Sequence, residues 1–454
     1  MKKAKFRFAA ALLVLTMTLS ACGGTSANSV PSNEPPPQPG SSDTSAAQPQ
    51  DGTAEPITIW VHASSHENAF KAYAETTGNP VNVVNIPYAD FQTKLKQSIG
   101  DAKTSPDLFV MSRDFAREWV EATGFITNLS QTFPDDLNEY KKNTYESLVV
   151  IGSNDGDIYG VTAEYSPGMM FYNREIAEKI LGTGDEDEVA AAINSEEKIL
   201  ALNEKLKAEY GGDVKMFGTF YNIAQYYFCS RVEPWVKDGV MEITPEIDHF
   251  MDWAKTVYDN DMILAIEEDN AYFNGIGQGL FFLDPLPAWG FNSKIKPQVV
   301  DSGRDMWSCT LPYMSYVRGG SFFFIPEAST KKDAAWDAIK YRVLNEDNLY
   351  ELRARELSFS SNKLVNERLL ANGHREPLLG GQEIFKTYNK EVPNVEAKFG
   401  NTINITKYDG FIAEFLRDMA NSYGAGQITK EAGYKDFKMR MESAYPEITV
   451  ILPQ

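Results

Sequence analysis

Basic side chains are scarce in this sequence. Its 454 residues include 43 Lys and Arg against 63 Asp and Glu, so the formal net charge is -20. A surface that binds nucleic acid needs an excess of positive charge, and a surface that docks directly on anionic lipid needs basic clusters. The composition therefore argues against both kinds of partner.

Histidine and cysteine, which are common ligands of transition metals, are also rare, with four and three residues. His62 and His66 have the spacing that places two imidazoles on one face of a helix. Here, however, His62 ends a predicted strand, and the next helix begins between the two residues. The stretch SNDGDIYG, residues 153–160, lacks the acidic closing residue of a calcium loop. We therefore expect no bound metal ion.

Nucleotide-binding signatures are missing as well. The glycines of FNGIGQG, residues 273–279, do not have the dinucleotide-binding spacing or its strand–turn–helix setting, and no Walker A sequence occurs. We also find no nucleophile paired with a base. The expectation is a protein without cofactors and without catalytic residues.

Only one long apolar run occurs, and it lies near the start of the chain. Residues 8–19, FAAALLVLTMTL, follow four basic residues and are too short for a comfortable membrane span, which is typical of a secretory signal peptide over residues 1–21. Leu19-Ser20-Ala21-Cys22 resembles a bacterial lipobox, which implies cleavage before Cys22 and lipid on that cysteine; the alternative is a cysteine placed there by chance. Residues 22–55 are rich in Ser, Pro, Gly and Gln and predict a disordered tether.

The chain after residue 55 alternates between strands and helices. ITIWVH (57–62), VNVVNI (81–86) and DLFVMS (107–112) are typical of strands, and each is followed by a segment with helical spacing. This alternation predicts an α/β fold with mostly parallel strands, in which ligands bind beyond the carboxyl ends of the strands. About four hundred residues are enough for two lobes rather than one core.

A set of segments in a fixed order carries a resemblance. The segments are SPDLFVMSRDF, DGDIYGVTAEYSPGMMFYNREIAEK, GQGLFF, and CTLPY followed by GGSFFFIPEASTKKDAAWDAIKY. Their order resembles that of the extracellular solute-binding proteins of ATP-driven importers, in the carbohydrate-type group that includes maltose-binding protein. The Thr-Trp motif that this group usually has after the YN helix is missing, so a maltose-like specificity is not implied.

The resemblance implies a fold of two lobes joined by a hinge, each lobe a mostly parallel sheet flanked by helices. Lobe one would comprise residues 56–163 plus 286–338, and lobe two residues 164–285 plus 339–454. The chain would cross between them near 163, near 285 and near 340. Closure about these crossings would enclose a solute.

Several residues match positions where this group contacts its solute. Glu164, Tyr165 and Ser166 lie at the first crossing, and Trp289 matches a stacking tryptophan. The remaining candidates are Asp114, which could also cap a helix, Tyr221, which could also be packed, Trp60, which could also be core, and His62 at the end of the first strand.

The functional expectation is a lipid-anchored, monomeric protein on the extracellular face of a bacterial membrane, with a Gram-positive envelope favoured. It would bind a carbohydrate and deliver it to an importer permease whose ATPase is a separate chain. The alternatives are a non-sugar solute, or a secreted glycoside hydrolase that pairs Glu164 with Asp284. Cys229 and Cys309 are assigned to different lobes, where a disulfide would restrain closure, so we expect both to be free.

Overall fold

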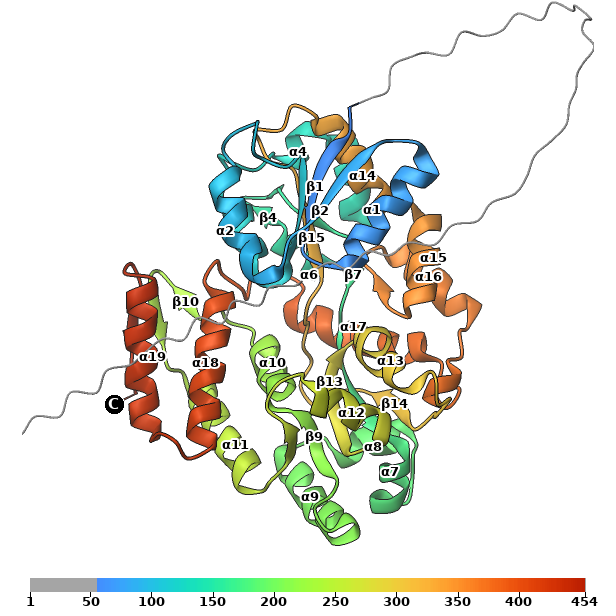
Figure 1. Cartoon of the computed structure of the whole chain (residues 1–454), viewed down its shortest axis with the longest axis vertical. Helices are drawn as coiled ribbons and strands as arrows, with labels where there is room; N and C mark the ends of the chain where they lie inside the picture. Colours follow the sequence, from blue (N-terminus) through green and yellow to red (C-terminus); the bar gives the residue numbers. More distant parts are fainter. Residues whose placement is uncertain (1–54, 454) are drawn as a thin grey trace, which may run out of the picture. The chain divides into compact units, whose positions relative to one another are not determined.

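The computed structural model describes residues 55–453 (Figure 1). The predicted signal peptide, Cys22 and the predicted tether up to residue 54 lie outside the described residues. In the described part, no helix combines the length and the apolar character needed to cross a membrane.

The first sheet contains the strands that the sequence predicts near its start. Its order is β2 (Val81–Asn85), β1 (Ile57–Val61), β3 (Leu108–Ser112), β15 (Ser321–Phe324) and β6 (Val161–Thr162). β1 runs parallel to β2 and β3, whereas β15 is antiparallel to its neighbours β3 and β6. Every residue of β15 is buried, while the edge strand β2 is partly exposed.

Helices associated with the first sheet come from two stretches of the chain. They are α1 (Ser64–Thr77), α2 (Tyr88–Ser98), α3 (Arg113–Glu121), α4 (Leu129–Thr132), α5 (Pro134–Asn143), α6 (Glu146–Ile151), α14 (Lys332–Val343), α15 (Glu346–Glu356) and α16 (Lys363–Asn372). A short hairpin, β4 (Ser153–Asn154) and β5 (Asp157–Ile158), lies beside α4 and α6. The predicted alternation of strand and helix at the start of the folded chain is confirmed.

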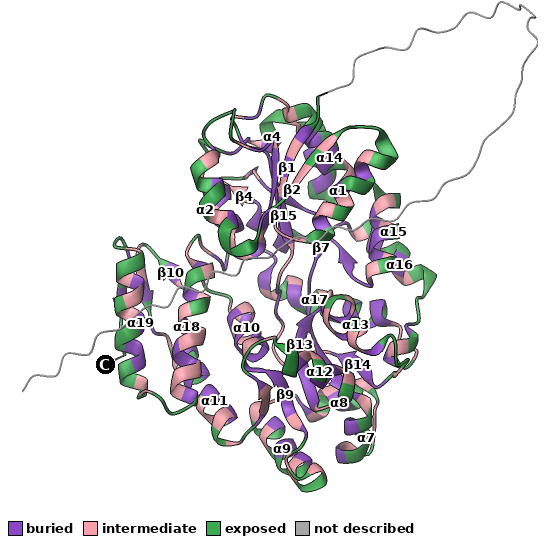
Figure 2. Cartoon of the chain, viewed as in Figure 1, coloured by how far each residue is buried: buried purple, intermediate pink, exposed green. Residues whose placement is uncertain are grey.

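The second sheet has the order β12 (Ile263–Ala265), β9 (Lys215–Thr219), β13 (Phe281–Pro287), β8 (Gly168–Asn173) and β14 (Trp307–Thr310). All residues of β8 and β13 are buried, as expected for central strands covered on both faces, and the edge strand β14 is buried as well (Figure 2). The intervening helices are α7 (Arg174–Leu181), α8 (Glu186–Ala192), α9 (Glu196–Tyr210), α10 (Phe220–Ser230), α11 (Pro245–Asp259), α12 (Asn270–Gln278), a π-helical turn (Phe291–Ile295) and α13 (Lys296–Val299).

The last part of the chain is helical, as the sequence predicts. A 3-10 turn (Pro377–Leu379) leads to α17 (Ile384–Phe399), α18 (Asp409–Gly424) and α19 (Lys430–Ala444), and α18 packs against α10, α11 and α19. A small sheet pairs β10 (Val236–Lys237), β11 (Val240–Glu242) and the terminal strand β17 (Thr449–Ile451).

Three connecting segments run side by side between the two sheets. β7 (Glu164–Tyr165) links β6 to β8 and pairs with β16 (Phe359–Ser360), while Pro167 forms a bridge with Val317. These contacts arrange the three segments as one hydrogen-bonded group, which is the arrangement that a hinge requires.

Two of the expected crossings are in different places from those predicted. β13 and β14 both belong to the second sheet, so the chain returns to the first sheet after Thr310 rather than near residue 285. The third segment beside the hinge is residues 359–361, not the helix near 340. The reason is that β14, expected in lobe one, completes the second sheet by pairing with the distant strand β8.

Candidate functional site

Glu164 lies on the first connecting segment, where the sequence predicts it. Its carboxylate oxygen Oε1 is 3.7 Å from Nη2 of Arg353, whose side chain is almost completely buried. The same Arg353 guanidinium donates to the carbonyl oxygen of Ala163. The acidic side chain of Glu164 is therefore held in place from α15 and keeps part of its surface accessible.

Tyr165 and Ser166, which follow Glu164 in the sequence, are buried, whereas Glu164 is partly accessible. The Tyr165 ring is 1% exposed and stacks on Tyr145 at 4.3 Å, and its hydroxyl donates to Glu396 at 2.9 Å. Burial, with Glu396 nearby, raises the pKa of Tyr165. Ser166 is also buried. Tyr165 is thus engaged by Tyr145 and Glu396, and both side chains have little accessible surface to offer a solute.

The carboxyl ends of the first three strands bring a group of polar and aromatic side chains together. The rings of His62 and Tyr88 are 5.3 Å apart, and the Tyr88 hydroxyl is 2.9 Å from the Ser112 hydroxyl. Nε2 of His62 is buried and has no hydrogen-bond partner in the described residues. Burial lowers the pKa of His62, and the charge of Glu164 partly opposes this shift.

Asp114 is the second residue of α3 and is half-buried beside this group. No hydrogen bond to its carboxylate occurs within residues 55–453, and Ser112, at the N-cap position, makes no side-chain cap either. Burial is the main reason why the pKa of Tyr88 is raised, and the charges of Asp114 and Tyr221 raise it further. Asp114 and Tyr221 therefore each lie near Tyr88, and the Asp114 carboxylate has no hydrogen-bond partner among residues 55–453.

Trp60, the other candidate on the first strand, is half-buried. It lies on the opposite face of β1 from Ile59 and Val61 and packs against the apolar cluster that contains Phe91 and Phe109. The structure thus favours the packing role that the sequence left open.

The second-sheet side contributes Tyr221, Trp289 and Arg318. Tyr221 is at the start of α10, which is capped by Thr219, and the Arg318 guanidinium lies 5.2 Å from its ring centroid. The Trp289 indole donates to the Arg318 carbonyl at 3.3 Å. Gly319 has a φ of 80°, and a Cβ there would lie 2.8 Å from the Trp289 indole nitrogen, so only glycine fits this close approach. Arg417 of α18 lies 5.0 Å from the same Tyr221 ring.

A network of buried hydrogen bonds holds the Arg318 side chain in place. Nη1 of Arg318 donates to the Asn222 side-chain oxygen at 2.8 Å, and the Asn222 amide donates to Asp284 at 2.9 Å. The Tyr272 hydroxyl donates to the other Asp284 oxygen at 2.7 Å. Burial raises the pKa of Asp284 to about 7. Since Asp284 is 0% exposed and both of its oxygens accept hydrogen bonds, it is not available to pair with Glu164 in glycoside hydrolysis.

Sequence reasoning missed Tyr88, Arg318 and Glu268. Tyr88 follows the strand β2, so the rule that ligands bind beyond strand ends could have found it. Arg318 lies in an irregular segment and has no periodicity that would point to it. Glu268 forms an ion pair with Lys294 through Oε2. Its other oxygen, Oε1, is buried and accepts no hydrogen bond from the described residues, which is unusual for a buried polar atom.

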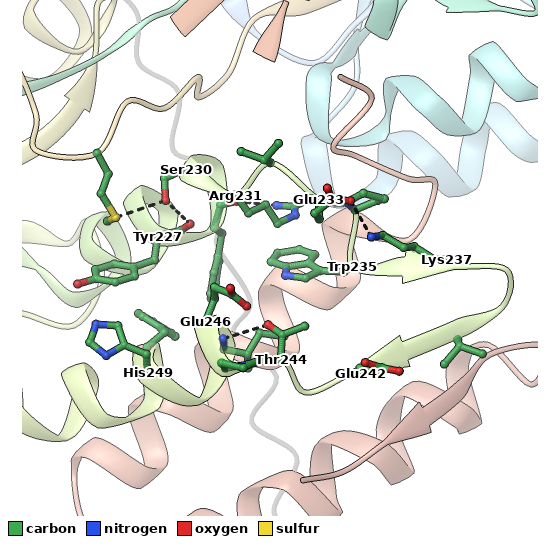
Figure 3. Close-up of a pocket in the computed structure, with 18 of the residues that line it drawn as sticks. Tyr227, Ser230, Arg231, Glu233, Trp235, Lys237, Glu242, Thr244, Glu246 and His249 are labelled. Atoms are coloured by element: carbon green, nitrogen blue, oxygen red, sulfur yellow. Dashed lines mark hydrogen bonds and ion pairs between the residues drawn. The ribbon is translucent and has the colours of Figure 1, made fainter. Parts of the chain in front are cut away.

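A separate cavity of about 1020 Å³ lies at the C-terminal end of α10, between the β10–β11 hairpin and the start of α11 (Figure 3). Trp235, Tyr227 and Phe250 contribute aromatic surface to its wall. None of the residues that the sequence predicts as a site lines this cavity.

Cys229 and Cys309 are free thiols, as predicted, although the stated reason was wrong. Cys309 lies on β14 of the second sheet, and Cys229 lies on α10, which follows β9 of that sheet. Within the residues that the structure describes, no group of three or more His, Cys, Asp or Glu could hold a metal ion.

Comparison with known proteins identifies related sequences and folds. Residues 68–355 match the family model for bacterial extracellular solute-binding proteins, and no curated protein matches the sequence significantly. The galacto-N-biose-/lacto-N-biose I-binding protein of the ABC transporter from Bifidobacterium longum is 16% identical, with a TM-score of 0.66 over 88% of this chain and 100% of its own.

Two further solved structures have similar folds. The sugar-binding protein MalE from Xanthomonas citri is 14% identical, with a TM-score of 0.64 over 86% of this chain and 97% of its own. The maltotriose binding protein of Thermus thermophilus is 16% identical, with a TM-score of 0.60 over 86% and 99%. These similarities establish the two-lobe solute-binding fold.

Proposed function

Because the chain belongs to the family of bacterial extracellular solute-binding proteins, we propose that it captures a carbohydrate between two lobes and delivers it to the permease of an ATP-driven importer. Each lobe is built on one of the two sheets, and the three connecting segments act as the hinge. The solute stabilises the closed form because it contacts both lobes. The protein acts as a monomer in this scheme.

The observation that carries the proposal is the convergence of polar and aromatic side chains from both sheets. Tyr88 and Asp114 come from the first-sheet side, and Tyr221 from the second-sheet side is close enough to affect the pKa of Tyr88. Glu164 lies at the hinge, and Trp289 and Arg318 lie beside Tyr221. These six residues form the proposed solute site, together with His62 and Glu268.

A carbohydrate fits the chemistry of these side chains. Sugar C–H faces lie on aromatic rings, and sugar hydroxyls both donate and accept hydrogen bonds. Tyr88, Tyr221 and Trp289 offer rings, while Asp114 and the unpartnered oxygen of Glu268 offer acceptors. Two of the similar structures are complexes with lacto-N-biose and with maltotriose, which supports the same ligand class here.

The location follows from the start of the sequence. A signal peptide over residues 1–21 directs export, and lipid on Cys22 holds the protein at the extracellular face of the membrane. Residues 23–55 then act as a tether for the folded body. The abundance of Ser, Pro and Gly in this segment supports that role.

A calorimetric screen of the full chain tests the proposal. The panel contains glucose, maltotriose, β-1,6-galactobiose and lacto-N-biose, with an oligopeptide and spermidine as controls. We expect binding of at least one sugar, with the sugar recovered intact afterwards. Tight binding of a control compound without any sugar response would overturn the solute class, and release of hydrolysis products would overturn the assignment as a binding protein.

A further inference from the structure

The cavity at the end of α10 has the size and lining of a ligand site. Its volume of about 1020 Å³ is at the upper end of the range of small-molecule pockets. Trp235 lies near its centre in Figure 3, with Tyr227 and His249 on one side and Glu246 below it. The Phe250 ring lies 5.2 Å from that of Tyr227, so aromatic surface extends along the wall.

The polar atoms of the wall are mainly acceptors without partners. Asp238, Glu242 and Glu246 line the cavity, and the hydrogen bonds and ion pairs of residues 55–453 do not involve their carboxylates. The cations of the wall are already engaged, since Lys237 pairs with Glu233 and Arg231 pairs with Asp409. A ligand that suits this wall brings hydrogen-bond donors and carries no negative charge.

A cationic ligand is disfavoured at the aromatic centre. The Arg231 guanidinium lies 3.6 Å from the Trp235 ring centroid and already makes the cation–π contact there. A second cation at this ring would be repelled by Arg231.

We propose that this cavity is a second carbohydrate-binding site, distinct from the solute site between the lobes. The inference rests on the proposed function for its ligand class. A sugar ring places its apolar face against the aromatic wall at Trp235, and its hydroxyls donate to Glu246 and Glu242.

The cavity adjoins the elements that join the two lobes. Met314, on the segment that returns to the first sheet, and Lys398 of α17 line its wall. Nη2 of Arg231 donates to the Asn404 carbonyl at 2.9 Å, and the Asn404 side chain accepts from Arg113 of α3 at 3.0 Å. Arg231, which lines the cavity, is thus linked through Asn404 to Arg113, the residue before Asp114 of the proposed solute site, so that the two sites can influence each other's affinity.

Calorimetry on the full chain with the same four sugars tests the second site. For the sugar that binds, we expect two binding steps in the wild type. Trp235→Ala weakens the second step by about tenfold or more and keeps the first, whereas Trp289→Ala weakens the first and keeps the second. Glu246→Gln, at an exposed position on the first turn of α11, should weaken the second step about threefold or more, and it covers the case in which Trp235→Ala fails to fold.

The outcomes separate the two proposals. A single binding step that is lost in Trp289→Ala and unchanged in Trp235→Ala and Glu246→Gln would overturn the second site and leave the proposed function standing. Competition for the cavity by a lysine-rich peptide, without any second sugar step, would overturn carbohydrate as its ligand. If no sugar binds the wild type, both proposals fail.

Discussion

Asp284 is a carboxyl group with no exposed surface, and its environment makes stability depend on pH. An aspartate in an unfolded chain ionises near pH 4, whereas burial raises the pKa of Asp284 to about 7. Between these values the folded protein holds a proton that the unfolded chain has released. The contribution of this group to the free energy of unfolding therefore falls as pH rises from about 4 to about 7 and is level above that range.

Asp284→Asn removes this titration, so we expect the melting temperature of the variant, relative to that of the wild type, to rise with pH between about 4 and 7. The change should be a few degrees, since the shift corresponds to on the order of a few kcal/mol. Differential scanning calorimetry over this pH range measures it. Asp301→Asn, at an exposed position, is the matched control. A constant difference between variant and wild type would show that Asp284 does not titrate in this way.

Trp289 is the residue of the proposed solute site whose replacement is easiest to interpret. We expect Trp289→Ala to weaken sugar binding by about 1–3 kcal/mol, because a stacked aromatic surface is lost. Trp289→Phe retains a ring and should lose less. Calorimetric titration with the sugar identified in the screen measures both. Unchanged affinity in a folded Trp289→Ala protein would remove this tryptophan from the site.

At the residue scale, prediction from the sequence worked where a side chain lies at a strand end. His62 follows the predicted first strand and Asp114 follows the predicted third strand, and the structure places both there; their contact with a solute stays a prediction. Neighbouring residues on the connecting segment could not be told apart, because the alternation that directs Tyr165 to the Tyr145 ring and leaves Glu164 accessible depends on pairing with β16. No local signal marks Arg318, since a distant residue, Asn222, positions its guanidinium.

At the element scale, strands with adjacent helices were predictable and isolated short strands were not. β1, β2 and β3 each precede a helix with clear apolar spacing, and their positions were predicted to within a few residues. β14 has four residues and no following helix, and its sheet is decided by pairing with β8, more than a hundred residues away. Such pairing is a tertiary property that apolar spacing alone does not encode.

The loop before α18 forms a bridge between elements on the two sides of the molecule. Asn404 is 1% exposed, accepts from Arg113 of α3, and donates to the carbonyl oxygen of Arg231, the residue after α10, at 2.7 Å. Phe115 of α3 and Phe411 of α18 have ring centroids 6.2 Å apart next to this bridge. The contact lies outside the three connecting segments, so in the proposed function we assign it to the closed form.

Asn404→Ala should therefore weaken solute binding, because buried Arg113 loses its side-chain acceptor in the closed form. A cost of about 1–3 kcal/mol corresponds to an affinity loss between about 5-fold and about 150-fold. Calorimetry with the identified sugar measures the affinity, and Asn401→Ala, at an exposed position in the same loop, is the control. A lower melting temperature with unchanged affinity would show that Asn404 stabilises the fold without favouring closure.

At the scale of the whole molecule, the order of segments along the chain was informative although no single segment was. The two-lobe fold was inferred from that order and is confirmed by the two five-stranded sheets and by the similar solved structures. The positions of the second and third crossings were not predictable. Each depends on which residues pair with the first connecting segment, and this pairing joins residues far apart in the sequence. The signal peptide, the lipid site and the tether are predictions from the sequence, because residues 1–54 lie outside the described residues.

In the proposed function, the placement of the whole molecule at the membrane depends on lipid attached to Cys22. We expect Cys22→Ser to prevent lipid attachment, so that the protein is recovered in the medium or the soluble fraction instead of the membrane fraction. Fractionation with an antibody to the folded body measures the distribution, and metabolic labelling with a radioactive fatty acid shows whether lipid is present.

Ser20→Thr, two residues before Cys22, is the control and should remain membrane-bound. Retention of Cys22→Ser in the membrane fraction would exclude lipid on Cys22 as the anchor.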